Sequence, residues 1–409
     1  MIVIIGAGVA GLTCAKYLKD NNIEALVLEA TAEVGGRVKT DIVEGFKLDR
    51  GFQVLLTSYP EAQALLNYKA LNFKALPSGA SIRMGNRYHV MPNPLKNWAT
   101  APQALLAPVG SLLDKAKVLQ LNLSLSKAPE PTAEQPFDNL TTLNFLQKFG
   151  YSETIINRFF VPFFRGVFLE EELKTDARFF KFLFNQFAKG DVVLPQNGMQ
   201  AIPEQLVAHL APQQLRLNTN VEKIVGNTIH LQNSETIIAT KIVLATNATA
   251  AAKLLNQPQL STQFNGTSCL YFYTTTPLTQ IKKPYLIINA NTNELIDHLI
   301  VLSHIAPSYA PEGKTLISVS LVGTTTFNDE ELINKVQHEL SHWFAGNYNW
   351  QHLRTYHIPE ALPQYFEQQY IFKSLKINDF MYQCGDYMAY PSLNAAMKTG
   401  REVAELLMQ

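Results

Sequence analysis

Cysteine is scarce in this chain, and its few copies fit neither a disulfide framework nor a zinc site. Cys14, Cys269 and Cys384 lie far apart and form no Cys-x-x-Cys pair, whereas both kinds of site depend on paired or closely spaced cysteines. We therefore expect no metal site of this kind. The scarcity fits a reducing compartment, so the composition predicts a cytoplasmic protein.

Strong net charge and long hydrophobic runs are also missing. The 34 basic and 34 acidic residues balance, so the chain lacks the basic footprint that nucleic-acid binding leaves. The uncharged stretch from Trp98 to Leu113 is broken by two prolines and a glycine. It is too short for a membrane span, which leaves a peripheral membrane contact as the open alternative there.

The length of 409 residues exceeds what one hydrophobic core usually supports, which predicts two or three lobes. The N-terminus has the pattern strand, tight turn, helix, strand, with buried runs at Ile2–Ile5 and Ala25–Leu28. This order implies a parallel sheet. The region 98–189 is mainly helical in pattern, and strand-like runs dominate afterwards, among them Arg216–Ile224 and His298–Ile305.

The first turn has the sequence Gly6-Ala7-Gly8-Val9-Ala10-Gly11, which fits G-x-G-x-x-G. The first glycine permits a tight turn, the second lets a pyrophosphate approach the backbone, and the third lets helix pack on strand. The helix N-terminus then points free N–H groups at the diphosphate. Glu29 ends the second strand, where a carboxylate accepts hydrogen bonds from ribose hydroxyls and disfavours a 2′-phosphate. These features predict a dinucleotide site that does not take NADP.

A second glycine-rich run follows Glu29-Ala30, at Val34-Gly35-Gly36-Arg37. Two glycines let the backbone pass close to a cofactor, and an arginine can neutralise pyrophosphate charge. The run from Glu29-Ala30 to Gly36-Arg37 resembles the extended FAD fingerprint of the flavin-containing amine oxidase superfamily, which includes monoamine oxidases, protoporphyrinogen oxidases and phytoene desaturases. The resemblance implies FAD rather than NAD as the cofactor.

Segments in the middle and at the end of the chain extend this resemblance. Val221 is similar to the family's valine whose backbone meets the adenine, and Ala245-Thr246 ends a run similar to the strand beside the FAD. Gly385-Asp386 resembles the pair whose acidic residue binds the ribityl–pyrophosphate region. The resemblance also implies a helix N-terminus at Leu393 that faces the flavin pyrimidine oxygen and stabilises negative charge there.

The branch of the family is indicated by one absence and by two further runs of residues. The stretch matching the amine oxidases' flavin-bridging lysine, Phe264 to Tyr271, contains no lysine. Cys384 is not a counterpart of the family's covalent flavin cysteine, which lies well upstream, so we expect non-covalent FAD. The runs Phe160–Phe168 and His357–Tyr365 resemble the protoporphyrinogen oxidase and phytoene desaturase branch. That branch implies a hydrophobic small-molecule substrate, such as an isoprenoid, carotenoid or tetrapyrrole-like compound, and O₂ or a quinone-like electron acceptor.

The substrate end of the site is less well defined. Phenylalanines cluster at Phe159–Phe168 and Phe179–Phe184, a pattern that is typical of a helical core. The alternative is that they form a hydrophobic substrate cavity or a membrane-facing lobe. Dehydrogenation over a flavin needs mainly position and exclusion of water, so no catalytic acid or base is assigned. Arg50 could orient a carboxylate or enolate oxygen of the substrate, or could bond the FAD or a neighbouring carboxylate.

One motif points elsewhere and is rejected. His338-Glu339-Leu340-Ser341-His342 fits the zinc-protease pattern H-E-x-x-H. The apolar stripe of this helix passes through Leu332, Val336 and Leu340, and the histidines fall largely off it, where solvent exposure is the simple interpretation.

Taken together, the sequence predicts an α/β flavoprotein. Its Rossmann-type FAD-binding domain has a parallel sheet, and its substrate domain combines a mixed or antiparallel sheet with an inserted helical lobe. We expect the FAD domain in three segments and the substrate domain in two, in the order 1–75 (FAD), 76–190 (substrate, mainly helical), 191–258 (FAD), 259–375 (substrate sheet) and 376–409 (FAD). The competing functions are a flavin amine or amino-acid oxidase and a non-catalytic flavin-binding scaffold.

Overall fold

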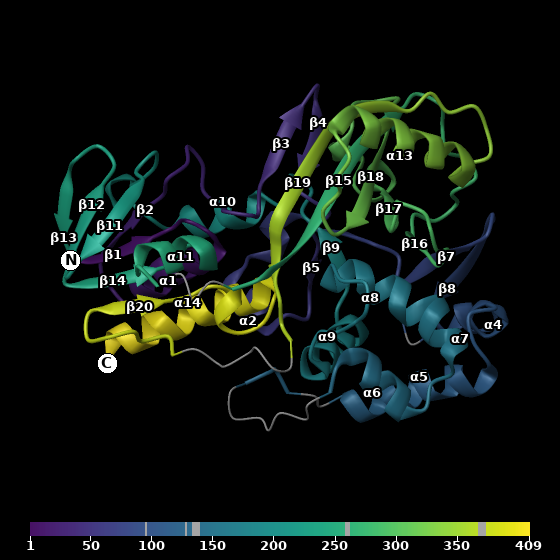
Figure 1. The fold of residues 1–409 in the computed structure, drawn as a ribbon, viewed down its shortest axis with the longest axis horizontal. Helices are drawn as coiled ribbons and strands as arrows, with labels where there is room; N and C mark the ends of the chain where they lie inside the picture. The colour runs from purple at the N-terminus through teal and green to yellow at the C-terminus, as the bar shows by residue number, and fades with distance from the viewer. Residues whose placement is uncertain (95, 127–128, 133–139, 258–261, 367–373) are drawn as a thin grey trace.

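The computed structural model describes residues 1–94, 96–126, 129–132, 140–257, 262–366 and 374–409. One lobe, on the left in Figure 1, is built on a parallel sheet in the order β10-β2-β1-β14-β20. Its strands come from the start, the middle and the end of the chain: β1 (Ile2–Ile5), β2 (Ala25–Leu28), β10 (Leu215–Arg216), β14 (Lys241–Leu244) and β20 (Met381–Gln383). All their pairings are parallel. Segments hundreds of residues apart therefore form one sheet.

The two faces of this sheet are covered differently. Helices α1 (Val9–Asp20) and α14 (Leu393–Met408) pack together on one face, where Ile2 and Ile4 of β1 join their core. The small antiparallel sheet β11-β12-β13 packs on the other face, against Val3 and Ile5. Its strands are β11 (Val221–Val225), β12 (Thr228–Leu231) and β13 (Thr236–Ile238). Both faces of β1 are thus buried, as expected for a strand of four aliphatic residues in a parallel sheet.

The second lobe contains a seven-stranded mixed sheet in the order β19-β15-β18-β17-β16-β7-β8. The strands are β7 (Gly79–Met84), β8 (Arg87–Pro92), β15 (Phe264–Thr274), β16 (Leu286–Asn289), β17 (His298–Val301), β18 (Thr315–Val322) and β19 (Gln351–Pro363). Helix α13 (Asp329–Trp343) covers one face and buries Leu332, Val336 and Leu340 against it. The long strands β15 and β19 run from this lobe toward the parallel sheet (Figure 1).

A helical lobe lies below this sheet at the right of Figure 1. Its helices are α4 (Ala101–Leu106), α5 (Leu112–Leu125), α6 (Thr142–Phe149), α7 (Glu153–Ile155), α8 (Val161–Phe168) and α9 (Ala177–Lys189). Helix α8 contacts β16 and β18, and α5 and α6 pack on α9. Phe160, Phe168 and Phe180 are buried at their junction. The helices therefore form the side of the substrate lobe opposite α13.

Shorter elements connect these lobes. The hairpin β3–β4 and the three-stranded sheet β5-β9-β6 lie between them in sequence and bring distant segments together. Their bounds are β3 (Thr40–Val43), β4 (Phe46–Asp49), β5 (Leu55–Leu56), β6 (Lys74–Ala75) and β9 (Val192–Leu194). The short helices are α2 (Pro60–Leu65), α3 (Tyr68–Leu71), α10 (Ala201–Val207), α11 (Ala248–Leu254) and α12 (Leu302–Ile305).

The expected fold class is confirmed, with local corrections. The strand expected at Arg216–Ile224 is two strands in different sheets, because Asn218 has a positive φ of 52° and its N–H donates to Thr31. The strand expected at His298–Ile305 ends at Val301 and continues as α12. Strands β7 and β8 lie in a segment that we expected to be mainly helical.

Candidate functional site

A cavity of about 1660 Å³ extends from the glycine turn after β1 to the helices α8 and α9. Most of the predicted site residues line it, although they come from all parts of the chain. Those lining it are Gly6, Gly8, Val9, Ala10, Glu29, Ala30, Gly36, Arg37, Arg50, Val221, Ala245, Thr246, Gly385, Asp386 and Leu393. The remaining two, Ala7 and Gly11, lie behind this wall and support it.

The glycine turn has the geometry that its sequence predicts. Gly6 has a φ of +110°, and a Cβ there would lie 2.7 Å from the carbonyl oxygen of Ala245. A Cβ on Gly11 would lie 2.1 Å from the carbonyl oxygen of Gly6, so α1 packs too closely on the turn for any side chain. A Cβ on Gly8, in contrast, would meet nothing and would occupy the space of the cavity. The backbone at Gly8 is therefore open to a ligand group.

Glu29 lies at the carboxyl end of β2 and is almost fully buried. Its Oε2 accepts the N–H of Ala7 at 2.9 Å, and its Oε1 accepts the N–H and the hydroxyl of Thr31 at 3.0 and 2.8 Å. These bonds hold the carboxylate at the cavity wall in one orientation. Because each carboxylate oxygen has further acceptor capacity, Glu29 can still accept hydrogen bonds from a ligand hydroxyl.

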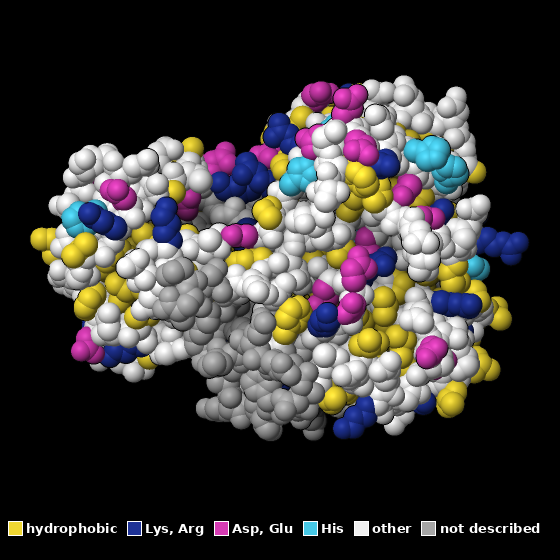
Figure 2. Space-filling view, in the orientation of Figure 1, with side chains coloured by type: hydrophobic (Ala, Val, Ile, Leu, Met, Phe, Trp, Pro, Cys, Tyr) yellow, Lys and Arg dark blue, Asp and Glu magenta, His cyan; other side chains and the backbone are white. Residues whose placement is uncertain are grey.

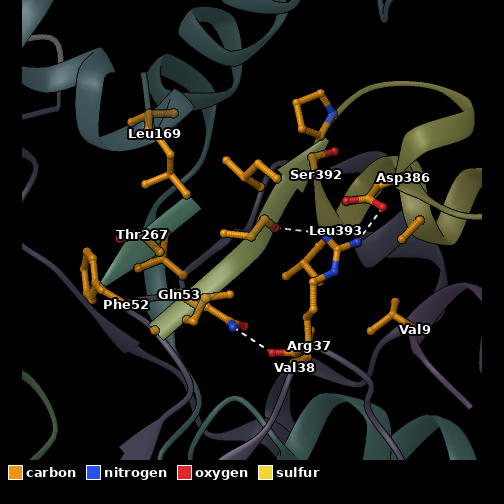
Figure 3. Close-up of a pocket in the computed structure, with 18 of the residues that line it drawn as sticks. Val9, Arg37, Val38, Phe52, Gln53, Leu169, Thr267, Asp386, Ser392 and Leu393 are labelled. Atoms are coloured by element: carbon orange, nitrogen blue, oxygen red, sulfur yellow. Dashed lines mark hydrogen bonds and ion pairs between the residues drawn. The ribbon is translucent and has the colours of Figure 1, made fainter. Parts of the chain in front are cut away.

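Arg37 and Asp386 connect the first glycine-rich segment with the end of the chain. Nη2 of Arg37 lies 2.6 Å from Oδ1 of Asp386, and Nη1 donates to the carbonyl oxygen of Ala361 at 2.7 Å. Figure 3 shows this pair beside Leu393, with Gln53 donating to the carbonyl oxygen of Arg37 at 2.9 Å. The guanidinium is a third exposed and lines the cavity. It is therefore anchored and still accessible to an anionic group.

The helix α14 begins at the same place. Ser392 caps it by accepting the N–H of Ala395 at 3.0 Å, and both Ser392 and Leu393 line the cavity. Gly400, two turns further on, lies so close to α1 that a Cβ would come within 2.3 Å of the carbonyl oxygen of Ala10. Two helix N-termini, those of α1 and α14, thus meet at one cavity wall.

This wall fits a long dinucleotide with a central diphosphate. The α1 N-terminus and the open space beside Gly8 suit the diphosphate, and Glu29 suits a ribose. The cavity continues past Arg37 and Asp386 to the helical lobe, which leaves room for a large ring system beyond the diphosphate.

The profile of the family described as flavin containing amine oxidoreductase matches residues 9–408. The chain belongs to this family. Membership confirms the expected oxidoreductase and its flavin cofactor.

Curated relatives fall in several branches of the family. A coproporphyrinogen III oxidase of Bacillus subtilis is 23% identical, over 89% of this chain and 87% of its own length. A 15-cis-phytoene desaturase of Capsicum annuum is 24% identical over 55% of this chain and 42% of the desaturase. An L-amino-acid oxidase of Bothrops moojeni is 26% identical over 63% of this chain and 54% of its own length. The chain thus spans about half the length of the last two relatives.

Solved structures agree on the fold and differ in activity. A putative protoporphyrinogen oxidase from Exiguobacterium superposes with a TM-score of 0.76 at 16% identity, covering 100% of this chain and 99% of that one. Putrescine oxidase superposes with a TM-score of 0.72 at 15% identity, covering 100% of this chain and 98% of that one. A UDP-galactopyranose mutase superposes with a TM-score of 0.70 at 16% identity, covering 100% of this chain and 95% of that one. Similarity of fold therefore does not choose the substrate.

The helical lobe supplies an apolar end to the cavity. Among the described residues from 112 to 190 that line it, Asn122 alone has a polar side chain. Six of these lining residues are phenylalanines: Phe159, Phe163, Phe164, Phe179, Phe184 and Phe187. The aromatic segments are thus partly helical core, as their pattern suggested, and partly cavity wall.

Arg50 lines the cavity in a small polar cluster that the sequence did not reveal. Its Nε and Nη2 donate to the two carboxylate oxygens of Asp41 at 3.0 and 2.8 Å, and the hydroxyl of Tyr356 donates to Oδ2 at 2.7 Å. These hydrogen bonds, led by that from Arg50, lower the pKa of Asp41. The geometry matches the neighbouring-carboxylate alternative for Arg50. A role in orienting the substrate stays a prediction.

Among the described residues, no lysine or cysteine lines the apolar end of the cavity. The lysines that line the described cavity are Lys223 of β11 and Lys253 of α11, in the lobe opposite α8 and α9 in Figure 1. Thr267 of β15 lines the cavity in the stretch that we expected to match the lysine-bearing strand of the amine oxidases. All three cysteines are buried, and none lines the cavity.

The H-E-x-x-H helix has a structural role. His338 and His342 of α13 are exposed and contact each other. The carboxylate of Glu339 accepts the backbone N–H groups of Leu295 and Ile296 at 2.6 and 2.9 Å. No cluster suited to a metal ion occurs among the described residues.

Proposed function

We propose that this protein dehydrogenates or desaturates a hydrophobic small molecule with non-covalently bound FAD, and passes the electrons to O₂ or a quinone-like acceptor. The carrying observation is the apolar end of the cavity, where the described lining residues of the helical lobe include one polar side chain and β15 contains no lysine. Isoprenoid, carotenoid and tetrapyrrole-like compounds are the substrate classes that fit such a wall.

The flavin, when bound, supplies the redox chemistry, and the chain supplies position. Gly8 and the N-terminus of α1 would hold the diphosphate, and Arg37 would neutralise part of its charge. Glu29 would hold the ribose, while the start of α14 at Leu393 would place a positive helix end at the ring system. Asp386 in turn holds Arg37, so the start and the end of the chain would position the cofactor together.

The phenylalanine wall has two roles in this proposal. It binds an apolar substrate by burial, at about 25 cal/mol for each Å² of apolar surface, and it excludes water from the reacting carbon. Position suffices for hydride removal, so the proposal requires no protein acid or base.

An amine or amino-acid oxidase is the second candidate, favoured by the L-amino-acid oxidase relatives. It would need a binding group for the amine or the carboxylate. Arg50 is a cavity-lining cation, but Asp41 already engages two of its nitrogens. The apolar wall therefore favours the first candidate.

We also propose a peripheral contact of the helical lobe with an anionic bilayer. No helix among the described residues combines the length and apolar character needed to cross a bilayer. Yet η1 (Trp98–Thr100), α4 and α5 expose a set of large hydrophobic side chains, which we term the apolar patch: Trp98, Leu105, Leu106, Leu112, Leu113, Leu119 and Leu123. Hydrophobic side chains are visible along the lower right of Figure 2, over this lobe.

Charge complements the apolar patch. Residues 87–126 contain four lysines and arginines and one acidic residue, Asp114, which is buried. Anionic lipid headgroups attract such a surface. Helix α5 carries the apolar patch on one side while its Val118 and Asn122 line the cavity, so a membrane-dissolved substrate would have a short path to the site.

The deciding experiment is purification followed by flavin spectroscopy and identification of co-purified ligand by mass spectrometry. A yellow protein that carries an apolar compound, and whose flavin is reduced by that compound and reoxidised by O₂ or a soluble quinone, supports the first candidate. Rapid flavin reduction by simple amines or amino acids, without response to apolar compounds, supports the second. A flavin that no donor reduces would leave a flavin-binding scaffold.

A further inference from the structure

His298 of β17 belongs to a row of polar side chains that crosses three strands of the substrate sheet. In the sheet register His298 pairs with Ser320 of β18, and Ser320 pairs with β15 two residues from Thr267. Thr267, Ser320 and His298, which we term the polar row, all line the cavity. Figure 3 places Thr267 beside Phe52, on the side of the view away from Val9 and Asp386. The otherwise apolar end therefore has a polar strip on its sheet side.

Two residues that the reaction scheme above does not use fix the imidazole of His298. Oδ2 of Asp297 lies 2.9 Å from Nδ1 of His298, and both side chains are buried. Arg165 of α8 donates from Nε to Oδ1 of Asp297, and from Nη2 to the carbonyl oxygen of Asn289 at 3.2 Å. Because a carboxylate accepts, Nδ1 carries the hydrogen. In the neutral ring Nε2 is then an acceptor.

Gly166 of α8 determines which edge of the imidazole is covered. A Cβ on Gly166 would lie 2.7 Å from Nδ1 and 3.1 Å from Cε1, so the helix backbone packs on that edge. The ring of Phe52 lies 5.6 Å from the imidazole, centroid to centroid. Nε2 forms no hydrogen bond with any part of the chain that the structure describes. It is the ring nitrogen that remains for a ligand.

We propose that Nε2 of His298 accepts a hydrogen bond from an N–H or O–H group of an otherwise apolar substrate, and so selects and orients that substrate. The inference rests on the proposed function, since it concerns the apolar end of the same cavity. A pure hydrocarbon leaves the desolvated acceptor unpaired, which is unfavourable. The polar row thus narrows the substrate class to apolar molecules that carry a hydrogen-bond donor.

Carbazole and fluorene test this directly. The two molecules are flat and tricyclic, but carbazole has an N–H group where fluorene has a CH₂ group. Each is titrated into the purified flavin-loaded protein, and binding is followed by probe fluorescence. We expect His298→Asn to lower the preference for carbazole over fluorene about 3- to 10-fold, the effect of one net hydrogen bond. The asparagine keeps an amide N–H for Asp297 and has no counterpart of Nε2.

His357→Asn is the matched control. His357 also lines the cavity, but Ser268 and Asp329 engage its two ring nitrogens at 3.0 and 2.7 Å. The preference for carbazole should survive this substitution. A preference unchanged in His298→Asn, or lost equally in both variants, overturns the role of His298.

A measurement on the unsubstituted protein keeps the test independent of variant folding. With nitrogen-labelled histidine, carbazole should shift one Nε2 resonance in the NMR spectrum, and fluorene should leave it in place. Equal responses to both probes overturn the inference while leaving the apolar cavity intact. Failure of both probes to bind the flavin-loaded protein overturns the apolar end itself, and the proposed function with it.

Discussion

Arg37 and Asp386 are 349 positions apart in the sequence, and their side chains form an ion pair of 2.6 Å at the cavity wall. Arg37 follows the second glycine-rich run, and Asp386 precedes the helix α14. The same guanidinium also binds the carbonyl oxygen of Ala361, in the long strand β19 of the other lobe. One arginine therefore joins the two chain ends and both lobes at the proposed cofactor site.

Loss of the Asp386 charge should weaken this junction. We expect Asp386→Asn to lower the free energy of unfolding by about 1–2 kcal/mol, since Arg37 is partly exposed and solvent screens the pair. Flavin retention should fall as well, measured as flavin absorbance per protein after gel filtration. Glu235→Gln is the control, because Glu235 forms an exposed ion pair with Arg216 away from the cavity. Equal flavin loss in both variants would contradict the assignment.

Alanine substitutions at two glycines of the first turn should affect stability and flavin affinity separately. Gly11→Ala places a Cβ against the Gly6 carbonyl oxygen and should cost roughly 1–3 kcal/mol of stability, as overpacking does. Gly8→Ala meets no protein atom, so its urea midpoint should stay near the wild-type value while its flavin affinity falls, because the methyl group occupies the diphosphate position. Full flavin affinity in Gly8→Ala would exclude that position for the diphosphate.

Asp49 should make stability depend on pH. Burial raises its pKa to about 6, although hydrogen bonds from Thr40, the Met199 N–H and Tyr309 oppose the shift. The unfolded carboxyl titrates near 3.8, so the folded state binds the extra proton between these values. The free energy of unfolding should therefore fall as the pH rises from about 4 to 6, by roughly 3 kcal/mol.

Urea unfolding of the wild type and of Asp49→Asn between pH 4 and 7 measures this contribution, which the variant should lack. Asp114→Asn is the control with the opposite sign. Burial alone would raise the pKa of Asp114, but hydrogen bonds from Ser152 and Ser111 hold it at about 2, so its contribution is present above pH 4 and is lost as the pH falls toward 2. A difference between the wild type and Asp49→Asn that does not vary with pH would refute the buried proton.

The apolar patch should bind vesicles that contain anionic lipid. Leu106→Ser and Leu123→Ser replace side chains that are 84% and 75% exposed, so the double variant should keep its melting temperature and lose most co-sedimentation with such vesicles. Ile238→Ser changes an equally exposed residue, 72%, in the other lobe, and should bind normally. Unchanged binding by the double variant would place any membrane contact elsewhere.

Much of the cofactor end was predictable because its signals are local. Gly6, Gly8, Gly11 and Glu29 lie within thirty residues, and each has a conformational or charge requirement that residue type alone expresses. The parallel strands β1 and β2 have the bounds that their aliphatic runs predict. In contrast, β7 and β8 were missed, because their sequences mix glycine, arginine and histidine with apolar residues. Their conformation is decided by pairing with each other and by the pairing of β7 with the distant β16.

The substrate end could not be predicted, because its groups act only through long-range packing. Asp297-His298 is an ordinary dipeptide until Arg165 and Gly166 of a distant helix orient it. Asp41 gains its partners Arg50 and Tyr356 through the hairpin β3–β4 and the long strand β19.

The amino-acid order by itself therefore determined the glycine turn after β1, the glutamate at the end of β2 and the alternation of strands and helices, since these depend on neighbours within one element. Only the tertiary structure decided that six phenylalanines form a cavity wall rather than core alone, and that one histidine keeps a nitrogen free beside them. A side chain's exposure to a cavity depends on what other segments bury, and those segments lie up to hundreds of residues away.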